Sequence, residues 1–474
     1  MAGKVIQILG TSSDAGKSTI AMCLCRYLSD KGFKVAPFKA VNMSLNSVSI
    51  EGGHEIARAQ WLQAKAARTE PSAEMNPYLL KPEGGSRSQL IESGRSHGSM
   101  TYLEYGEYMK ANAPRVIRSS LDSLLSRYDI VVAEGAGSPA EINLEHRDFA
   151  NTFVSSLYNS PVLLVADIDR GGVFASIYGT ISLMERPDLV RGIIINRMRG
   201  DSSILTNGIK KIEEMTNKRI IGVMPFVENT LPGEDSLNYT SPKLISSDIA
   251  VVAYPHMENY SDVDPLFSAG LGCTFVHRAD EIRETTRVII LPGSKDVQAD
   301  LEFLRNNGLA EKIKDRARQG ARLLGICGGY QMLGTRINDY GNVEMRSKSV
   351  EGLGLLPCET SYSREKTVRK VKFRTLVGND ASQHSGYEIH FGTVHGRANP
   401  LNITEYGPEG SITGNIMGTN IHGILEDSAF LSYLTGTNIT KDYGEDLERN
   451  IDNMTKAFIE NVDVDFIYEV LNGY

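Results

Sequence analysis

Short apolar runs alternate with longer amphipathic stretches through the first half of the chain. The runs are hydrophobic at nearly every position, which is typical of strands that are buried on both faces of a parallel sheet. Helix-length segments separate these runs, as expected when parallel strands are joined by crossover helices. We therefore predict a mostly parallel sheet covered by helices, with strands within residues 4–10, 33–40, 129–137, 161–169, 190–198 and 219–226.

The first helix is predicted directly after the first strand. Apolar residues at positions 20, 23, 24, 27 and 28 follow the spacing of a helix with one buried face. Gly32 supplies a C-terminal stop. Cys23 and Cys25 lie on this helix about 200° apart, so we expect packing residues there rather than a shared metal site.

A second set of buried runs follows a break in the pattern. Between residues 229 and 248 periodicity fades and turn-forming residues gather, and new apolar runs begin within 248–256, 286–294 and 321–329. Residues 335–420 have a weaker pattern. We predict four parts: a first α/β domain (1–235), a linker (236–248), a second α/β domain (249–445) and a C-terminal helical extension (446–474).

Composition narrows the class of protein. The 474 residues carry a formal net charge of −8 and no dense basic tract, which disfavours nucleic acid as the main partner. The glycine-rich loop begins at residue 10, which leaves no room for a signal peptide, and the apolar runs are too short to span a bilayer. The five cysteines are odd in number and scattered, as in a reducing compartment. We expect a cytoplasmic protein without a membrane segment.

A phosphate-binding loop is predicted at the end of the first strand, in the stretch GTSSDAGKS. Backbone N–H groups in such a turn point at an anion, and the helix that follows adds partial positive charge. Lys17 supplies a mobile cation and Ser18 a hydroxyl for Mg²⁺. Five residues separate Gly10 from Gly16, where the strict pattern has four, and the alternative is an incidental glycine-rich turn.

Acidic residues at other strand ends are the candidate metal ligands of this site. Glu134 ends the run in DIVVAEGAG, although strand ends commonly carry acids without any such role. Asp167 and Asp169 end another strand and face either the metal or the substrate, or serve only as turn formers.

The second half contains a candidate nucleophile in ARLLGICGGYQMLG. Cys327 lies between an apolar strand and a predicted helix, and glycines surround it, which permits a sharp turn that exposes a thiol. A buried structural cysteine is the alternative. Histidine is the usual base for a thiol nucleophile, and His422 is placed best by pattern, with His384 and His390 as competitors.

The phosphate loop resembles that of the dethiobiotin synthetase-like ATP-dependent enzymes. Further segments, among them KAVNMSLNS, MNPYLLKP, EGAGSPAEINL and VADIDRGGVFAS, are similar to the cobyric acid synthases, a branch of the glutamine-dependent cobyrinic acid amidases. The resemblance implies that Lys17, Ser18 and Glu134 contact phosphate and Mg²⁺. It also implies nucleotide contacts from Thr11, Asp14, Gly16 and Lys39, and an adenine contact from Asn196.

The segment around Cys327 is similar to the class I glutamine amidotransferase domain of the same amidases. The resemblance implies Cys327 as nucleophile and His422 as base, with backbone N–H groups near Gly293 and after Cys327 as the oxyanion hole. Such domains have an acid two residues after the histidine, whereas this chain has Ile424 there and its nearest acid at Glu426. Whether Glu426 orients the histidine, or no third residue does, stays open.

The combined resemblance implies an amidating enzyme with ATP and Mg²⁺ as cofactors. Its partners would be glutamine and a corrinoid, adenosylcobyrinic acid a,c-diamide, whose b, d, e and g carboxylates become amides. Arg58, Lys81 and Arg87 are candidate cations for this acidic substrate, or else ordinary surface charges. The alternatives are a cobyrinic acid a,c-diamide synthase, a regulatory P-loop ATPase, and a scaffold with an inactive amidotransferase domain.

Overall fold

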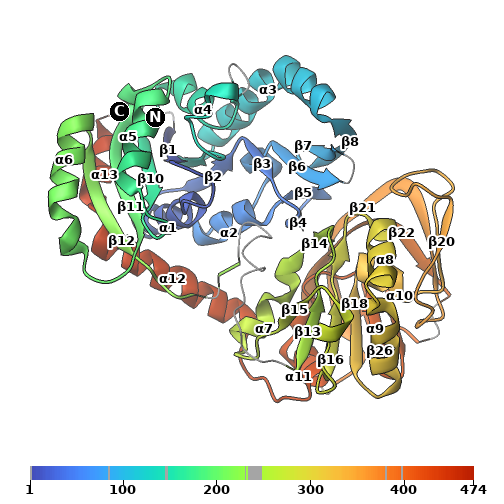
Figure 1. The fold of residues 1–474 in the computed structure, drawn as a ribbon. Helices are drawn as coiled ribbons and strands as arrows, with labels where there is room; N and C mark the ends of the chain where they lie inside the picture. The colour runs from blue at the N-terminus through green and yellow to red at the C-terminus, as the bar shows by residue number, and fades with distance from the viewer. Residues whose placement is uncertain are drawn as a thin grey trace.

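The predicted strands of the first half form one six-stranded sheet in which every neighbouring pair is parallel (Figure 1). Its order is β12-β11-β10-β1-β9-β2. The computed structural model describes residues 3–83, 86–144, 148–229, 231–232, 248–378, 382–396 and 399–473. The strands are β1 (Lys4–Gly10), β2 (Val35–Lys39), β9 (Ile130–Glu134), β10 (Val162–Asp167), β11 (Val190–Met198) and β12 (Arg219–Pro225).

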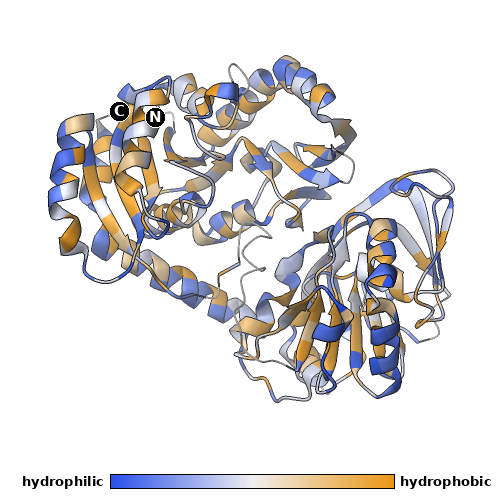
Figure 2. Ribbon diagram, in the orientation of Figure 1, coloured by the Kyte–Doolittle hydropathy of each residue, from blue (hydrophilic) through white to orange (hydrophobic). Residues whose placement is uncertain are grey.

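Helices cover both faces of this sheet, because its strands are apolar on both sides. On one face lies α1 (Lys17–Asp30), with part of α2 (Arg58–Ala66). The other face carries α3 (Tyr102–Leu125), α4 (Thr152–Tyr158), α5 (Val173–Leu183) and α6 (Thr206–Thr216). Figure 2 shows the hydrophobic residues concentrated in the strands and the hydrophilic ones on the outer sides of the helices.

An insertion between β2 and α3 adds a small four-stranded sheet and a hairpin. The sheet has the order β3-β6-β7-β8, with strands Val41–Met43, Tyr78–Glu83, Arg87–Glu92 and Arg95–Thr101. The hairpin joins β4 (Ser47–Ile50) and β5 (His54–Ala57). It packs its apolar side against the second domain and so helps to form the domain interface.

The second domain contains a six-stranded sheet of order β15-β13-β16-β18-β26-β25, parallel except for its last pair. Its strands are Thr274–Val276, Ile249–Val252, Val288–Leu291, Arg322–Ile326, Ile416–Thr419 and Ser411–Thr413, in that order. One face carries α8 (Val297–Asn306), α9 (Leu309–Arg318) and α10 (Gly328–Leu333), and the other carries α7 (Asp264–Ser268) and α11 (Ser428–Thr435). Of the predicted linker 236–248, only residue 248 lies within the described residues.

Most of the weakly patterned region 335–420 forms a mainly antiparallel sheet beside the parallel sheet of the second domain. Its strands are β19 (Arg336–Asn338), β20 (Ser349–Glu351), β21 (Glu359–Thr375), β22 (His384–His395), β23 (Asn402–Thr404) and β24 (Gly407–Glu409). The long pair β21 and β22 reaches toward the first domain, where it meets the β4–β5 hairpin. This pair therefore forms the second domain's side of the interface.

The last two helices return to the first domain. Figure 1 shows α12 (Tyr443–Asn461) running from the second domain to the first, where α13 (Val464–Asn472) follows it. Both pack into the core that α1 covers, and the Asp463 N–H donates to the Ile221 carbonyl at 2.7 Å. Of the helices that the structure describes, none has the length and apolarity to cross a membrane.

Candidate active site

The phosphate loop begins where β1 ends, and its backbone is shaped by two residues with positive φ. Asp14 has φ 57° and Gly16, at the start of α1, has φ 97°. The Lys17 ammonium folds back over the loop and donates to the carbonyl oxygens of Ser12 at 2.8 Å and Gly137 at 3.0 Å. A β-carbon at Gly10 would lie 2.9 Å from the Lys17 side chain, so a larger residue there would displace the lysine from this position.

Glu134 lies at the centre of this site, fully buried at the end of β9. Its Oε1 accepts from the Ser18 hydroxyl at 2.6 Å and from the Lys39 ammonium at 2.9 Å. Its Oε2 accepts from the Gln63 amide at 2.7 Å. The structure therefore brings together Lys39, Ser18 and Glu134, three residues predicted as phosphate or Mg²⁺ contacts.

Gln63 is a member of this site that the sequence analysis missed. It lies on α2 one turn after Gln60, whose side chain accepts from the Asn42 amide at 2.8 Å. Two buried glutamines at i and i+3 on an otherwise apolar helix face were the available indication, because buried amides need polar partners.

The donors of this site suit a hard divalent cation. The Ser18 hydroxyl and the Glu134 carboxylate are oxygen ligands of the kind that Mg²⁺ binds, usually together with water and substrate phosphates. Within the described ranges, no three His, Cys, Asp or Glu side chains come together as a metal cluster. A cation here would therefore depend on phosphate oxygens for much of its coordination.

The remaining predicted residues of the first domain surround the loop. Asp14 pairs with Arg170 and, at 2.9 Å, with Arg197, which also binds Asp167 at 3.0 Å. Asp169 lies in a separate, more exposed pair with Arg199 at 2.6 Å. Asp167 is thus tied to the loop through an arginine, whereas Asp169 is not.

Two further predicted contacts, Thr11 and Asn196, hold the loop backbone. The Thr11 N–H donates to the Val165 carbonyl at 2.9 Å. The Asn196 amide donates to the Ala15 carbonyl at 3.0 Å and fills the space above Gly16, where a β-carbon would lie 2.0 Å from it. Both residues therefore fix the position of the loop, and the adenine contact of Asn196 remains a prediction.

Cys327 occupies a strained turn between β18 and α10, with φ 52° and ψ −112°. Glycines make this turn possible, because a β-carbon at Gly329 would lie 2.0 Å from the Leu291 carbonyl oxygen, and one at Gly328 would lie 2.7 Å from the Ser294 nitrogen. A cysteine in this conformation costs backbone energy, which is typical of a functional turn. Ser294 and Gly328 line the same small cavity as Cys327, and the backbone N–H groups around Gly293 and after Cys327 remain the candidate oxyanion donors.

His422 is fully buried between β26 and the 3₁₀ helix Ile424–Glu426, and a carboxylate holds its ring. Its Nδ1 lies 2.7 Å from Asp262 Oδ2, and Asp262 Oδ1 accepts from the Gly423 N–H at 3.0 Å. The Tyr387 ring stacks on the imidazole with centroids 5.0 Å apart. Burial lowers the pKa of His422, but Asp262 and the contact with Cys327 outweigh it and raise the pKa to about 10.

The acid that contacts the His422 ring is Asp262, not Glu426. Glu426 lies instead 3.7 Å from Arg58 of the first domain. Asp262 belongs to the 3₁₀ helix η6 (Tyr260–Val263), some 160 residues before the histidine, so no spacing rule near His422 could have found it. A competing histidine, His384, lies 3.6 Å from Asp427.

A small cavity adjoins Cys327 and contains several charged groups. Its lining includes Glu258, Lys295, Glu344, Lys366 and His390. Lys295 binds Glu344 at 2.8 Å and, across the domain interface, Glu83 at 3.2 Å. Burial lowers the pKa of His390, whose ring lines the same cavity as Cys327.

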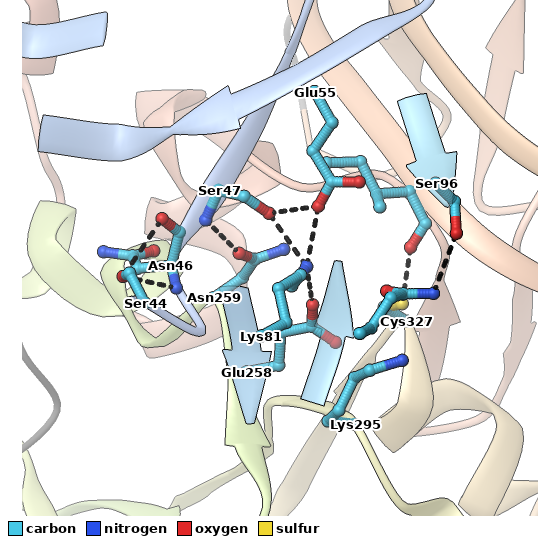
Figure 3. A network of polar contacts seen from close by, with 12 residues as sticks. Ser44, Asn46, Ser47, Glu55, Lys81, Ser96, Glu258, Asn259, Lys295 and Cys327 are labelled. Atoms are coloured by element: carbon cyan, nitrogen blue, oxygen red, sulfur yellow. Dashed lines mark hydrogen bonds and ion pairs between the residues drawn. The ribbon is translucent and has the colours of Figure 1, made fainter. Parts of the chain in front are cut away.

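A buried ion network joins this cavity to the first domain (Figure 3). The Lys81 ammonium is fully buried and binds Glu258, Glu55 at 2.8 Å and the Ser47 hydroxyl at 3.0 Å. Lys366 binds the other oxygen of Glu55 at 2.7 Å. Burial raises the pKa of Glu55, but the two lysines together hold it well below its ordinary value.

The three candidate substrate cations have different surroundings. Lys81 lies in the ion network, and Arg58 is buried against Glu426 and the Trp61 ring. Both therefore belong to the domain interface rather than to an open surface. Arg87 is exposed and binds Ser99.

Comparisons with known proteins agree with this division into two centres. Residues 6–236 match the family model described as the CobQ/CobB/MinD/ParA nucleotide binding domain. Residues 248–430 match the CobB/CobQ-like glutamine amidotransferase domain. The first domain is accordingly a nucleotide-binding domain and the second a glutamine amidotransferase domain.

Whole-chain relatives are also similar. A "Probable cobyric acid synthase" of Picrophilus torridus is 52% identical over 474 residues, covering 99% of each chain. One of Thermoplasma acidophilum is 53% identical, covering 97% of this chain and 98% of the relative. A "Cobyric acid synthase" of Dehalococcoides mccartyi is 40% identical, covering 99% of each.

Proposed function

The chain belongs to the cobyric acid synthase family, and on that premise we propose that it amidates the b, d, e and g carboxylates of adenosylcobyrinic acid a,c-diamide in cobalamin biosynthesis. Glutamine supplies the nitrogen and ATP, with Mg²⁺, drives the reaction. The observation that carries the proposal is that one chain holds both a buried Cys–His–Asp arrangement and a phosphate loop with its acid, joined by a buried interface.

Ammonia is produced at Cys327. The thiolate attacks the side-chain amide carbon of glutamine, the C–N bond breaks, and His422 gives a proton to the departing ammonia. A raised pKa suits this role, because the imidazolium is present at neutral pH and stabilises the neighbouring thiolate. Water then hydrolyses the thioester to glutamate, with the imidazole as base.

The acceptor carboxylate is activated at the phosphate loop. A free carboxylate resists attack by ammonia, whereas an acyl phosphate has a good leaving group. Lys17, Ser18, Lys39 and Glu134 bind the phosphates and the cation in this proposal, with support from Thr11, Asp14, Gly16 and Asn196. Mg²⁺ would supply positive charge for the transferring phosphoryl group. The substrate carboxylate accepts this group, and ammonia then displaces phosphate to leave the amide.

The experiment follows the corrinoid by mass spectrometry with Mg-ATP and either glutamine or ammonium chloride. We expect Cys327→Ser to lose amidation with glutamine by at least about a thousandfold, because the nucleophile is gone, while amidation with ammonia is retained. The matched control is Cys23→Ala, since burial raises the pKa of that thiol to about 12 and it should matter with neither donor.

Two outcomes would contradict the proposal in different ways. Loss of both activities in a folded Cys327→Ser protein would contradict the division of labour between the domains. An unchanged corrinoid with intact glutaminase activity would contradict the substrate assignment, and cobyrinic acid would then be tested as the substrate.

A further inference from the structure

The first domain reaches the glutaminase histidine through Asn259. This residue connects β14 (Met257–Glu258) to η6 and is almost fully buried. Its side-chain Nδ2 lies 3.4 Å from His422 Nε2, the ring nitrogen opposite the one that Asp262 holds. Asn259 and Asp262, three residues apart, therefore contact the two nitrogens of one imidazole.

The first domain holds this short segment by three hydrogen bonds. The Ser47 N–H donates to Asn259 Oδ1 at 2.9 Å, and the Asn259 N–H donates to the Leu45 carbonyl at 3.1 Å. The Ser261 hydroxyl donates to Asn46 Oδ1 at 2.8 Å. Asn46, Ser47, Asn259 and Ser261 are buried and Leu45 is half-buried, so these bonds are largely shielded from competition by water; Figure 3 shows Asn46, Ser47 and Asn259 close together.

The bond from Ser47 also fixes which way the Asn259 amide faces. Because Oδ1 must accept from a backbone N–H, the NH₂ group is the one beside His422. An NH₂ group can donate only to an unprotonated Nε2, so this contact favours the neutral ring with its proton on Nδ1 toward Asp262. It therefore restricts the ring in the orientation in which Nε2 acts as the base.

The first-domain segment that contacts Asn259 follows directly from the phosphate site. Lys39 ends β2 with its ammonium on Glu134, and residues 40–47 lead directly from it to the contacts with Asn259. Within this stretch, the Asn42 amide donates to Gln60 on the helix that also carries Gln63. One continuous stretch thus touches both centres.

We propose that the nucleotide-binding domain positions the glutaminase histidine, with Asn259 as the positioning residue and Leu45–Ser47 as the element that holds it. The inference rests on the proposed function, since it assigns His422 to glutamine hydrolysis. The amidotransferase centre is complete only when the two domains are docked through these contacts.

Other groups also surround His422, and the experiment must separate the effect of Asn259 from theirs. Asp262 and Cys327 contact the ring, Tyr387 stacks on it with Arg58 and Glu426 behind, and His390 lies nearby. A substitution at Asn259 leaves all of these in place. Asn259 has φ 52°, a conformation that aspartate tolerates and glycine adopts freely, so Asn259→Asp and Asn259→Gly add little backbone strain.

The experiment measures glutamate release from glutamine by the full chain between about pH 6 and 10, without corrinoid, giving kcat and KM separately. For Asn259→Gly we expect kcat about tenfold lower with KM within about twofold and an unchanged pH profile. For Asn259→Asp we expect the profile to move about one unit to higher pH, because a carboxylate there disfavours the thiolate and favours the imidazolium.

The matched control is Lys370→Ala. This substitution breaks an exposed ion pair, in which Lys370 Nζ lies 2.9 Å from Glu51 Oε1 across the same interface. It should behave as the unmodified protein. Amidation with ammonia should persist in all three variants, which also shows that they fold.

Unchanged kcat and pH profile in both Asn259 variants would overturn the inference. So would an equal loss in Lys370→Ala, since general docking rather than Asn259 would then be responsible. Absence of glutamine hydrolysis in the unmodified protein would instead contradict the proposed function.

Discussion

The two centres of this protein are built in opposite ways. The phosphate site is formed within one domain from residues at strand ends, and Gly16, Lys17 and Ser18 are contiguous in the chain. The proposed glutaminase site draws Cys327, His422 and Asp262 from three distant segments, and the first domain holds the segment with Asp262. A site shaped by backbone turns is thus visible as a motif, whereas a site assembled by side chains from separate elements is not.

The strongest way to sharpen this comparison is to remove the lysine of the phosphate loop. We expect Lys17→Met to lower amidation by at least about a hundredfold with glutamine and with ammonia alike, because both routes need the activated carboxylate. Glutamate release in the absence of corrinoid should persist. Amidation with ammonia at the unmodified rate would remove Lys17 from the phosphate site.

An effect confined to the glutamine-dependent route is expected at the carboxylate of the proposed glutaminase site. Asp262→Asn should lower glutamine-dependent kcat by about 10²-fold or more while amidation with ammonia is unchanged, as expected when a catalytic histidine loses its orienting carboxylate. The carboxylate raises the pKa of His422, so its loss lowers that pKa. Since activity is lost as pH rises through this pKa, the basic limb of the profile should move to lower pH.

Glu426→Gln provides the matched control for that variant. Glu426 is the nearest acid in sequence but lies near Arg58, not near His422 Nδ1. A shift of the basic limb with Glu426→Gln, and none with Asp262→Asn, would show that the sequence neighbour orients the histidine after all.

The smallest effect on catalysis, and the largest on stability, is expected at the interface between the centres. Lys81→Met leaves Glu55 and Glu258 as buried carboxylates with less compensation, which should lower the free energy of unfolding by about 3–5 kcal/mol. Denaturant unfolding measures this change. The exposed pair Lys370–Glu51 serves as control and should contribute less than about 1 kcal/mol.

Much of the fold could be predicted from the sequence, because parallel strands buried on both faces have a strong apolar pattern. The predicted strands of both sheets and the helix after Ser18 are confirmed. The small sheet within residues 41–101 and the antiparallel region after residue 335 were not predicted, because their strands are half-exposed and alternate irregularly.

The candidate sites were predictable to a different degree. Cys327 and Lys17 stand out in the sequence because they are flanked by glycines, and the turns there leave little or no room for a β-carbon. Asp262 and Asn259 act through contacts with residues far along the chain, and no local pattern marks them. Gln63 was indicated only by its spacing from Gln60 on α2. Lys81 shows the reverse case, since a lysine looks like a surface charge until its buried partners are known.

The return of α12 and α13 to the first domain has a consequence for how the protein is made. Their side chains, Phe458 and Ile467 among them, complete the core on which α1 packs. A ribosome delivers this last part of the first domain only after the entire amidotransferase domain has emerged. The first domain therefore cannot mature as an independent unit during synthesis, although domains generally fold in the order in which they are translated. In the folded protein the chain passes between the two domains twice. Two covalent connections therefore limit the movement of one domain relative to the other.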